Sequence, residues 1–205
     1  MPVTREKSEQ TLAAIVSAAM EIAVVQGLHT VSLAGVAKRL NISKSGVFMR
    51  VGSLESLQYL VLEEYERLFA EHVFLPALRE PRGVPRLDAI VRLWIGRGSA
   101  RNPMAGALHA SAAFDLVAAE TPLGERLRES VTRWRTVLVR TVRQALAEGH
   151  LRPDTDPWQL VYEINSLMIG YLHDGRFIRD PQVRERVTAA YLRLMSTYRS
   201  FQLHG

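Results

Sequence analysis

Apolar residues spaced three and four positions apart recur through most of the chain, and this spacing restricts the fold to helices. No stretch alternates apolar and polar residues over the length of a strand. The chain is therefore predicted to be all-α, with about nine helices. The first apolar stripe consists of Leu12, Ile15, Val16, Ala19, Ile22 and Ala23.

Glycine, asparagine and serine mark the ends of the first three helices. Gly27 is expected to end the first, because glycine tolerates the left-handed turn beyond a helix C-terminus. Ser32 and Ser43 are expected to cap the second and third, with Asn41 closing the second. The pattern predicts a long helix, then a helix, a three-residue turn and another helix.

The rest of the chain is divided mainly by proline. Ser53 begins a long helix, and Pro76 is expected to bend or end it because proline cannot donate to the helix ladder. Residues 80–85, "EPRGVP", are expected to form a loop. Further helices are predicted over 85–98, 104–119, 122–148, 157–178 and 181–202.

Composition excludes several classes of site. Of the 205 residues, 47% are hydrophobic and 23% charged, which suits a globular protein with a buried core. The absence of cysteine excludes disulfides, thiolate zinc sites and cysteine nucleophiles. No apolar run near 18 residues predicts a membrane span, and "MPVTREKSEQ" does not resemble a signal peptide, so we expect a cytoplasmic protein.

Positive charge is concentrated at the N-terminal end. Residues 1–50 hold six cationic side chains and three carboxylates, whereas the whole chain has a net charge of +5. A basic N-terminal quarter favours a polyanionic partner, although this signal is weak by itself.

The segment "LNISKSGVFMRVGS", residues 40–53, has the character of a recognition helix with its turn. In a helix-turn-helix the second helix enters the DNA major groove, while the first crosses the backbone. The two helices are expected to be held together by Val36, Ala37, Leu40, Ile42, Val47 and Val51. Five side chains then remain on the outer side of the second helix of the motif: Lys44, Ser45, Phe48, Met49 and Arg50. Their cationic, hydroxyl and apolar groups are of the kinds that contact phosphates and base edges.

The longer segment "TVSLAGVAKRLNISKSGVFMRVGSLESL", with the helix before it, resembles the DNA-binding domain of the TetR family of bacterial repressors. The resemblance covers about residues 8–60. The family's usual recognition-helix tyrosine is Phe48 here, and its common lysine at the start of the fourth helix is Leu54. "GALHASAAFD" and "EGHLRPDTDP" resemble one broad subgroup of the family's C-terminal domains.

The resemblance implies a DNA-binding domain at 1–53 and a helical effector-binding and dimerisation domain at 54–205. Arg5 and Lys7 are open to two interpretations, a disordered tail or a flexible arm on phosphate. The candidate DNA contacts are Arg5, Lys7, Ser32, Lys38, Ser43, Lys44, Ser45, Phe48, Met49, Arg50 and Ser53.

The second domain is expected to enclose a mostly apolar cavity for a small molecule. No histidine pair has metal-ligand spacing, and His109 near Asp115 lacks a nucleophile and an orienting group, so we predict no metal, cofactor or active site. The same aromatic residues also fit an ordinary core. The candidate ligand contacts are Trp94, Met104, His109, Phe114 and Trp134.

One recognition helix covers few base pairs, so we expect a homodimer on a palindromic DNA operator. The last two helices are predicted to form its interface as a four-helix bundle. The candidate interface residues are Leu160, Ile164, Leu167, Met168, Tyr171, Val187, Tyr191, Leu194 and Tyr198.

The leading hypothesis is a repressor released from its operator by a small, mostly apolar effector. Two alternatives remain at this stage. One is a constitutive DNA-binding regulator without an effector. The other is a helical enzyme or carrier whose N-terminal helices only mimic the motif.

Overall fold

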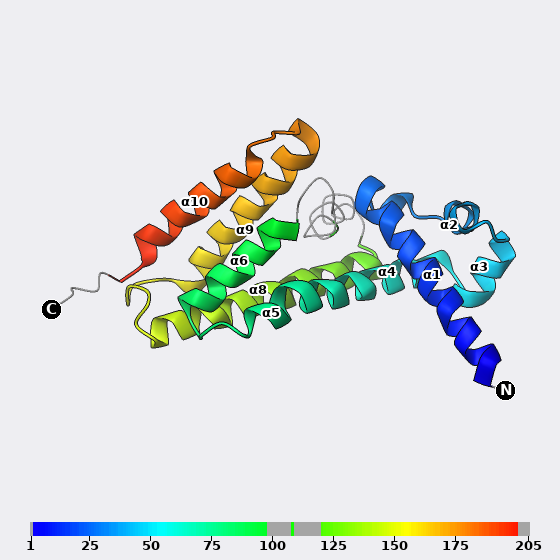
Figure 1. The fold of residues 1–205 in the computed structure, drawn as a ribbon, viewed down its shortest axis with the longest axis horizontal. Coiled ribbons are helices and arrows are strands. Elements are labelled where there is room, and N and C mark those ends of the chain that lie inside the picture. The colour runs from blue at the N-terminus through cyan, green and yellow to red at the C-terminus, as the bar shows by residue number, and fades with distance from the viewer. Residues whose placement is uncertain (1, 98–107, 109–119, 201–205) are drawn as a thin grey trace. The chain divides into compact units, whose positions relative to one another are not determined.

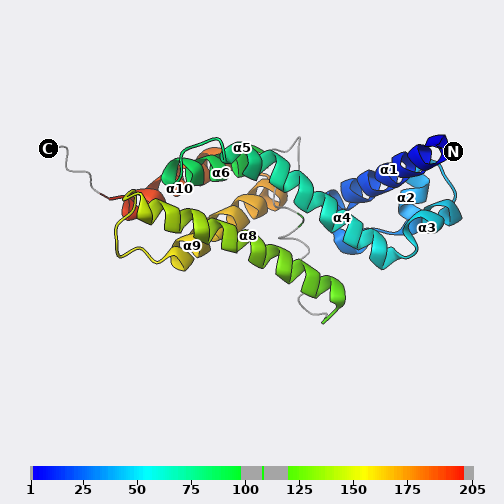
Figure 2. The same cartoon turned by 90° about the horizontal axis from the view of Figure 1, so that it is seen from below.

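The computed structural model describes residues 2–97, 108 and 120–200, with side chains from Ser8 onward except at Arg97. Its regular elements are helices, as predicted (Figures 1 and 2). Contacts between residues divide the chain into two compact units. Unit 1 comprises 1–68 and 108–129, and unit 2 comprises 69–107 and 130–205. The contacts thus divide the chain after Leu68 rather than at the predicted functional boundary, and both α4 and α8 pass from one unit to the other.

Unit 1 contains the predicted helix-turn-helix. Its elements are α1 (Pro2–Gln26), a 3₁₀ turn (Leu28–Thr30), α2 (Leu33–Leu40), α3 (Lys44–Val51), most of α4 (Leu54–Phe69) and the start of α8 (Pro122–Ala147). Each helix turns an apolar face inward, which removes that face from water and stabilises the unit. The fully buried side chains include Ile15, Ala19, Ala23, Val36, Val47, Leu57 and Val61.

Serine hydroxyls cap the two short helices, as the sequence predicts. The Ser32 Oγ accepts a hydrogen bond from the Gly35 N–H at 3.0 Å, and the Ser43 Oγ accepts one from the Gly46 N–H at 3.0 Å. A Cβ atom at either glycine would lie 3.0 Å from the capping oxygen, which is tighter than most real contacts. The two Ser-x-x-Gly segments therefore leave room for the caps that begin α2 and α3.

The turn between α2 and α3 depends on a left-handed residue. Asn41 has φ 53°, which confirms its expected place at the end of α2. The Ile42 N–H then donates to the Ala37 carbonyl at 3.0 Å and closes the helix. The prediction that Ile42 packs between the two helices is wrong, since its side chain is 39% exposed.

The helix that begins after Ser53 changes its winding before Pro76. α4 ends at Phe69, a π-helical turn covers Ala70–Phe74, and α5 (Leu75–Ala77) holds the proline. The Leu75 N–H donates to the Ala70 carbonyl five residues earlier, which is the π-helical pattern. Pro76 has no N–H to continue the ladder, and the helix ends one residue after it, as expected.

Unit 2 is a bundle with an aromatic centre. α6 (Val84–Arg97), the rest of α8, α9 (Pro157–His173), a π-helical turn (Asp174–Ile178) and α10 (Val183–Tyr198) surround it. Phe69, Phe74, Trp94 and Trp134 contact one another edge to face, with ring centroids 4.5 to 5.8 Å apart. Edge-to-face contact between such rings adds to the stabilisation from burial.

Most predicted helix bounds in this unit lie within two residues of the observed ones. The clearest difference is at the C-terminal end, where α10 stops at Tyr198 instead of continuing to 202. Arg199 is extended and pairs with Leu151 in an isolated antiparallel bridge, which ends the helix. The predicted loop is shorter than expected, because α6 already begins at Val84. The predicted helix over 104–119 lies outside the described residues, apart from Leu108.

Three tyrosine hydroxyls hold α9 and α10 in place. The Tyr191 hydroxyl donates to Asp88 of α6 at 2.7 Å, and Tyr171 donates to the Ile95 carbonyl at 2.9 Å. The Tyr198 hydroxyl donates to Glu163 of α9 at 2.9 Å. Each bond satisfies a partly buried polar group, and so fixes the helices more firmly than apolar contact alone.

Burial, followed by the hydrogen bond to Glu163, raises the pKa of Tyr198 to about 12 from the ordinary value of 10.0. Its neutral form is therefore favoured by folding, and this contribution is complete below pH 10 and is lost as the pH rises through 12. We expect Tyr198→Phe to flatten the fall in unfolding free energy over that interval, measured by urea titration at several pH values. An unchanged slope would contradict the assignment.

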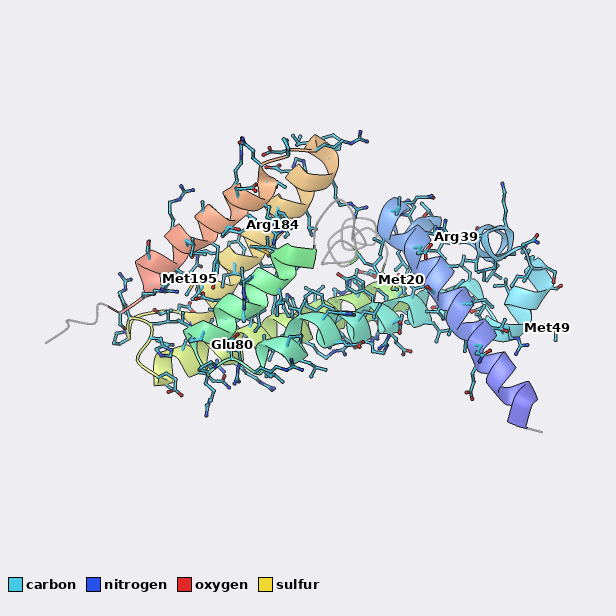
Figure 3. The ribbon with its side chains drawn as sticks, viewed as in Figure 1. Met20, Arg39, Met49, Glu80, Arg184 and Met195 are labelled. Atoms are coloured by element: carbon cyan, nitrogen blue, oxygen red, sulfur yellow. The ribbon has the colours of Figure 1, made fainter. Side chains whose placement is uncertain are left out.

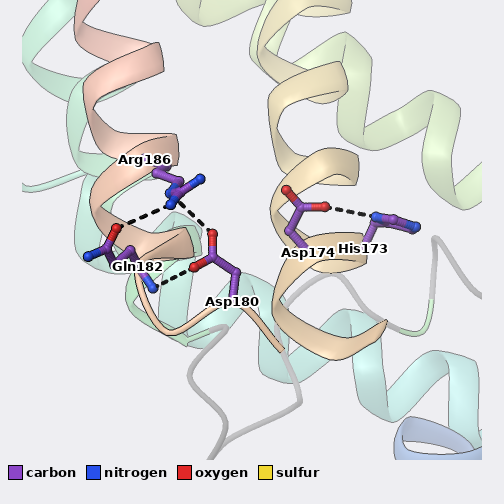
Figure 4. A network of polar contacts seen from close by, with 5 residues as sticks. All are labelled: His173, Asp174, Asp180, Gln182 and Arg186. Atoms are coloured by element: carbon purple, nitrogen blue, oxygen red, sulfur yellow. Dashed lines mark hydrogen bonds and ion pairs between the residues drawn. The ribbon is translucent and has the colours of Figure 1, made fainter. Parts of the chain in front are cut away.

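The connection from α9 to α10 is held by a local polar network (Figure 4). His173 Nδ1 and the Asp174 carboxylate lie 2.8 Å apart at the end of α9. The Asp180 carboxylate accepts a hydrogen bond from the Gln182 N–H at 2.9 Å and forms an ion pair with Arg186 at 3.2 Å. These contacts fix the start of α10 and leave the apolar faces of both helices to packing.

One described helix has the length and mean hydropathy of a membrane span, residues Ser8–Gln26 of α1. The expectation that no segment would pass this test is therefore wrong. The same residues include Ile15, Ala19 and Ala23, which are fully buried against the rest of unit 1. Packing within unit 1 therefore explains why α1 is so apolar, because a buried core helix can have the same length and mean hydropathy as a membrane span.

Candidate nucleic-acid interface

The outer face of α3 carries the side chains that the sequence predicts there. Phe48 is 53% exposed and Met49 is 83% exposed, although both are large apolar residues (Met49 is labelled in Figure 3). Lys44, Ser45 and Arg50 are exposed beside them. Val47 and Val51, by contrast, are buried and fix the opposite face of α3 to the unit. A short rigid helix therefore presents cations, a hydroxyl and apolar groups together.

Arg50 is held from α1, by a contact that the sequence pattern does not predict. Its guanidinium donates a hydrogen bond to the hydroxyl of Ser8, 42 positions earlier in the chain. The Ser43 and Ser45 hydroxyls lie 3.1 Å apart at the other end of α3. Both ends of the exposed face are thus positioned by polar contacts, which restricts the directions in which the charges can point.

The basic side chains near this face differ in their partners. Arg39 of α2 forms an ion pair with Glu21 of α1 (Arg39 is labelled in Figure 3). Lys38 and Lys44 are exposed, and no ion pair to either is found among the residues with described side chains. Lysines in this situation are suited to phosphate, which each can contact as a point charge.

Three predicted DNA contacts have a structural role. The hydroxyls of Ser32 and Ser43 accept the capping hydrogen bonds, and Ser53 accepts one from the Ser56 N–H at 2.9 Å. The Ser53 hydroxyl also donates to the Ser56 hydroxyl at 2.9 Å. Hydrogen bonds within unit 1 therefore account for the positions of these three hydroxyls without DNA. A phosphate contact at these serines remains a prediction.

Arg5 and Lys7 lie within α1, which begins at Pro2. The backbone is therefore helical where a disordered tail or a flexible arm was expected. Their side chains lie outside the described set. Leu54, which replaces the lysine common in the resembling family, is 39% exposed at the start of α4.

The predicted ligand contacts are only partly described. Trp94 and Trp134 are buried in the aromatic centre of unit 2, with ring centroids 4.9 Å apart. Both thus occupy core positions, and an effector would have to open the cluster to contact both rings. Met104, His109 and Phe114 lie outside the described residues. The ligand role of all five remains a prediction.

The predicted dimer contacts divide into two groups by their burial within the subunit. A side chain with almost no exposed surface in one subunit has none to offer to another. Leu167, Leu194 and Tyr198 are half-buried and stay candidates. The other residues are buried within the subunit's own core and have little surface to offer a partner, so their place in the interface stays a prediction; they are Leu160, Ile164, Met168, Tyr171, Val187 and Tyr191.

Other large apolar side chains on these helices remain outside. Trp158 is 50% exposed and Tyr162 is 60% exposed on α9, with Ile169 further along the same helix. Leu192 of α10 is 58% exposed. Residues 158, 162 and 169 are spaced so that they form a stripe along one face of α9. A comparison of both faces of this helix in the sequence could have revealed the stripe.

A second contact missed by the sequence joins α4 to the start of α8 within unit 1. The two terminal guanidinium nitrogens of Arg126 donate hydrogen bonds to the two carboxylate oxygens of Glu66, at 2.8 and 3.0 Å. Both side chains are about three-quarters buried, and the hydrogen bond with Glu66 raises the pKa of Arg126. Such a bidentate pair fixes direction as well as distance. With 60 positions between the partners, no local pattern marks it.

Comparisons with known proteins agree with this architecture. A family model described as the C-terminal domain of tetracycline-repressor-like proteins matches residues 83–191, more than half of the chain. A comparison with curated protein sequences finds no significant match.

Among solved structures, a TetR transcriptional regulator from Chloroflexus aurantiacus is 20% identical, with a TM-score of 0.83 over 95% of this chain and 98% of that one. The ketosteroid transcriptional regulator KstR2 of Mycobacterium tuberculosis is 12% identical, with a TM-score of 0.70 over 93% and 95%.

A transcriptional regulator from Saccharomonospora viridis, solved in complex with choline, is 15% identical, with a TM-score of 0.73 over 94% of this chain and 99% of that one. At these identities the likeness shows a shared fold over nearly the whole length of each protein. Together with the matching family model and the helix-turn-helix of unit 1, it shows that the chain belongs to the TetR family of DNA-binding transcriptional regulators.

Proposed function

We propose that this regulator is a repressor that binds a palindromic operator as a homodimer and leaves it when a small effector binds. The observation that carries the proposal is the outer face of α3. There Lys44, Ser45, Phe48, Met49 and Arg50 are exposed on a helix whose other face is fixed in unit 1. The site of action is then the cytoplasm, where a bacterial operator lies.

The chemistry of this face suits the major groove. Lysine and arginine side chains neutralise phosphates, and arginine can also donate two hydrogen bonds to guanine. Phe48 lacks the hydroxyl of the family's usual tyrosine, so its ring can contact only a sugar or a thymine methyl group. We therefore assign backbone anchoring to Lys44 and Arg50, and apolar base contact to Phe48 and Met49.

The proposed dimer surface is the exposed stripe of α9 with Leu192 of α10. Water-exposed Trp158, Tyr162 and Ile169 are costly to leave uncovered, and a second copy would cover all of them at once. A two-fold interface uses the same patch on both subunits, so one stripe serves both. Two recognition helices related in this way read the two halves of a palindrome.

The proposed effector is small and mostly apolar. The printed descriptions of two similar structures name a ketosteroid regulator and a choline complex, which supports a small organic molecule as the effector class. The aromatic centre of unit 2 offers contacts to such a molecule if the rings separate. α4 and α8 each pass from unit 2 to unit 1, so both can transmit the change.

A gel shift with the DNA that flanks the gene tests this function. We expect one retarded species, competed by the same palindrome and not by unrelated DNA. Absence of binding to any flanking sequence would contradict an operator nearby. A constitutive regulator remains the alternative, and it would bind DNA while showing no rise in melting temperature with any metabolite. An enzyme is set aside, because TetR-family regulators are non-enzymatic transcription factors.

Tryptophan fluorescence tests the effector's role. We expect an inducer to change the emission of the chain, because two of its three tryptophans are buried in one cluster. Thermodynamic linkage requires the inducer to bind more weakly to the operator complex, by the same factor that it weakens operator binding. The measurement is a titration with and without operator DNA. A compound that binds equally in both conditions is not an inducer.

A further inference from the structure

The bidentate pair between Glu66 and Arg126 lies close to where the chain leaves unit 1. Glu66 is on α4, two positions before Leu68, the last residue of unit 1 on that helix. Arg126 is on α8, three positions before the corresponding residue, Glu129. Each partner is thus within one helical turn of the point at which its helix continues into unit 2 (Figure 2 labels both helices). The pair therefore joins two helices that each continue from one unit into the other.

The pair restrains direction as well as distance. Its hydrogen bonds of 2.8 and 3.0 Å use two nitrogens of Arg126 and both carboxylate oxygens of Glu66, so neither side chain can turn without breaking one of them. Both side chains are about three-quarters buried, and a partly buried ion pair is screened less than an exposed one. Four positions after Glu66, at Ala70, the helix changes to π-helical winding. The pair thus fixes α4 to α8 just before the place where its own hydrogen-bond ladder is irregular.

A small rotation of α4 at this pair produces a large displacement at the DNA-reading end. Twelve positions separate Glu66 from Leu54, the first residue of α4, which corresponds to about 18 Å of helix. A rotation of about 10° at Glu66 therefore moves the first residue of α4 by about 3 Å. Successive base pairs are about 3.4 Å apart along DNA. Since α3 directly precedes α4, such a rotation displaces the recognition helix by about one base-pair step.

We propose that Glu66 and Arg126 are positioning residues that set the half-site spacing which the dimer accepts in its operator. They hold α4 to α8 in each subunit, so the two copies of α3 keep one separation when the dimer meets DNA. One added or deleted base pair shifts a half-site by about 3.4 Å and turns it by about 35°, so it no longer fits both helices at once. The spacing role rests on the proposed homodimer and palindromic operator, whereas the restraint of α4 by this pair does not.

Arg126→Lys tests the pair with no change in net charge. Lysine keeps the positive charge that Glu63 and Glu129 also favour at this position, but it lacks the planar fork that binds both carboxylate oxygens. Glu66→Gln is the second variant, because glutamine has a similar size and removes the carboxylate charge. The matched control is Arg128→Lys, the same change at an exposed position of α8 two residues further along. Circular dichroism checks that each variant is folded.

The first measurement needs neither DNA nor a dimer. The chain has no cysteine, so Val25→Cys in unit 1 and Arg143→Cys in unit 2, both at exposed positions, carry the only spin labels. Double electron–electron resonance on labelled chain diluted with unlabelled chain gives the distribution of label distances within one subunit. We expect both pair variants to broaden this distribution by about 3 Å or more, and the control to leave it unchanged. Distributions equal to the parent's in both pair variants overturn the proposal.

The second measurement uses the operator and copies of it with one base pair inserted or deleted at the centre. Fluorescence anisotropy gives the ratio of the Kd for each altered operator to that for the original. We expect both pair variants to lower this ratio by about threefold or more, because α3 adapts to altered spacing once the charged hydrogen bonds are lost. The double variant should lower it no further than the stronger single variant, since both changes remove the same contact.

The outcomes separate this role from a purely structural one. A purely structural pair would lower the melting temperature and leave the Kd ratio unchanged, and that result overturns the proposal. So does a ratio that Arg128→Lys lowers as much as Arg126→Lys does. If the parent chain binds no operator, the proposed function is contradicted and the spacing role with it. The distance measurement then still decides whether the pair restrains α4.

Discussion

Replacing both Lys44 and Arg50 by alanine is expected to weaken operator binding by at least about 10⁴-fold, since each lost charged contact contributes about 1.5–3 kcal/mol and the dimer loses four of them. Both side chains are exposed on the outer face of α3. A dimer loses two contacts for each substitution, so each single variant should lower the slope of log affinity against log salt by about 2. Fluorescence anisotropy at several salt concentrations measures both quantities.

Two controls separate a local effect from a change in net charge or fold. Arg143→Ala removes the same charge from an exposed position on α8 and should leave the salt slope unchanged. Ser8→Ala removes the hydrogen bond to Arg50 without altering charge, and we expect a smaller loss of affinity with an unchanged slope. If the double variant keeps its circular dichroism and still binds like the parent, α3 is not the DNA-reading helix.

The local signals in the sequence were sufficient for the helix-turn-helix because each of them acts over three or four residues. Ser32 and Ser43 cap as predicted, since a serine oxygen reaches the N–H three positions ahead in almost any fold. Asn41 likewise ends α2 by its own backbone preference. Such features depend little on the rest of the chain, and periodicity is therefore enough to place them.

The candidate sites in unit 2 were harder to predict, because α9 has two apolar faces. Periodicity shows that Leu160, Ile164 and Met168 share one stripe, and the structure confirms that spacing. It does not show whether the stripe meets the subunit's own core or a second subunit, and the structure assigns it to the core. Contacts such as Glu66–Arg126 are equally hidden, because they join residues far apart in the chain.

The choice between the two faces leads to a prediction with a large effect. We expect Tyr162→Glu together with Leu192→Glu to convert a dimer into soluble, folded monomers, because these side chains are exposed in one subunit. In the proposed interface each substitution places two carboxylates near the two-fold axis, where they are desolvated and repel each other. Analytical ultracentrifugation measures the dissociation constant, and operator affinity should fall with it, since a monomer reads only half of the palindrome.

The contrast with the buried face makes this prediction specific. Met168→Glu introduces a charge into the core of unit 2, so it should reduce the unfolding free energy and solubility rather than only the oligomeric state. Leu78→Glu, at an exposed apolar position after α5, is the matched control and should leave the dimer intact. If the double variant remains a dimer with an unchanged dissociation constant, the stripe from Trp158 to Ile169 is not the interface. The half-buried Leu167 and Leu194 would then be the next positions to test, because they keep some exposed surface beside the core.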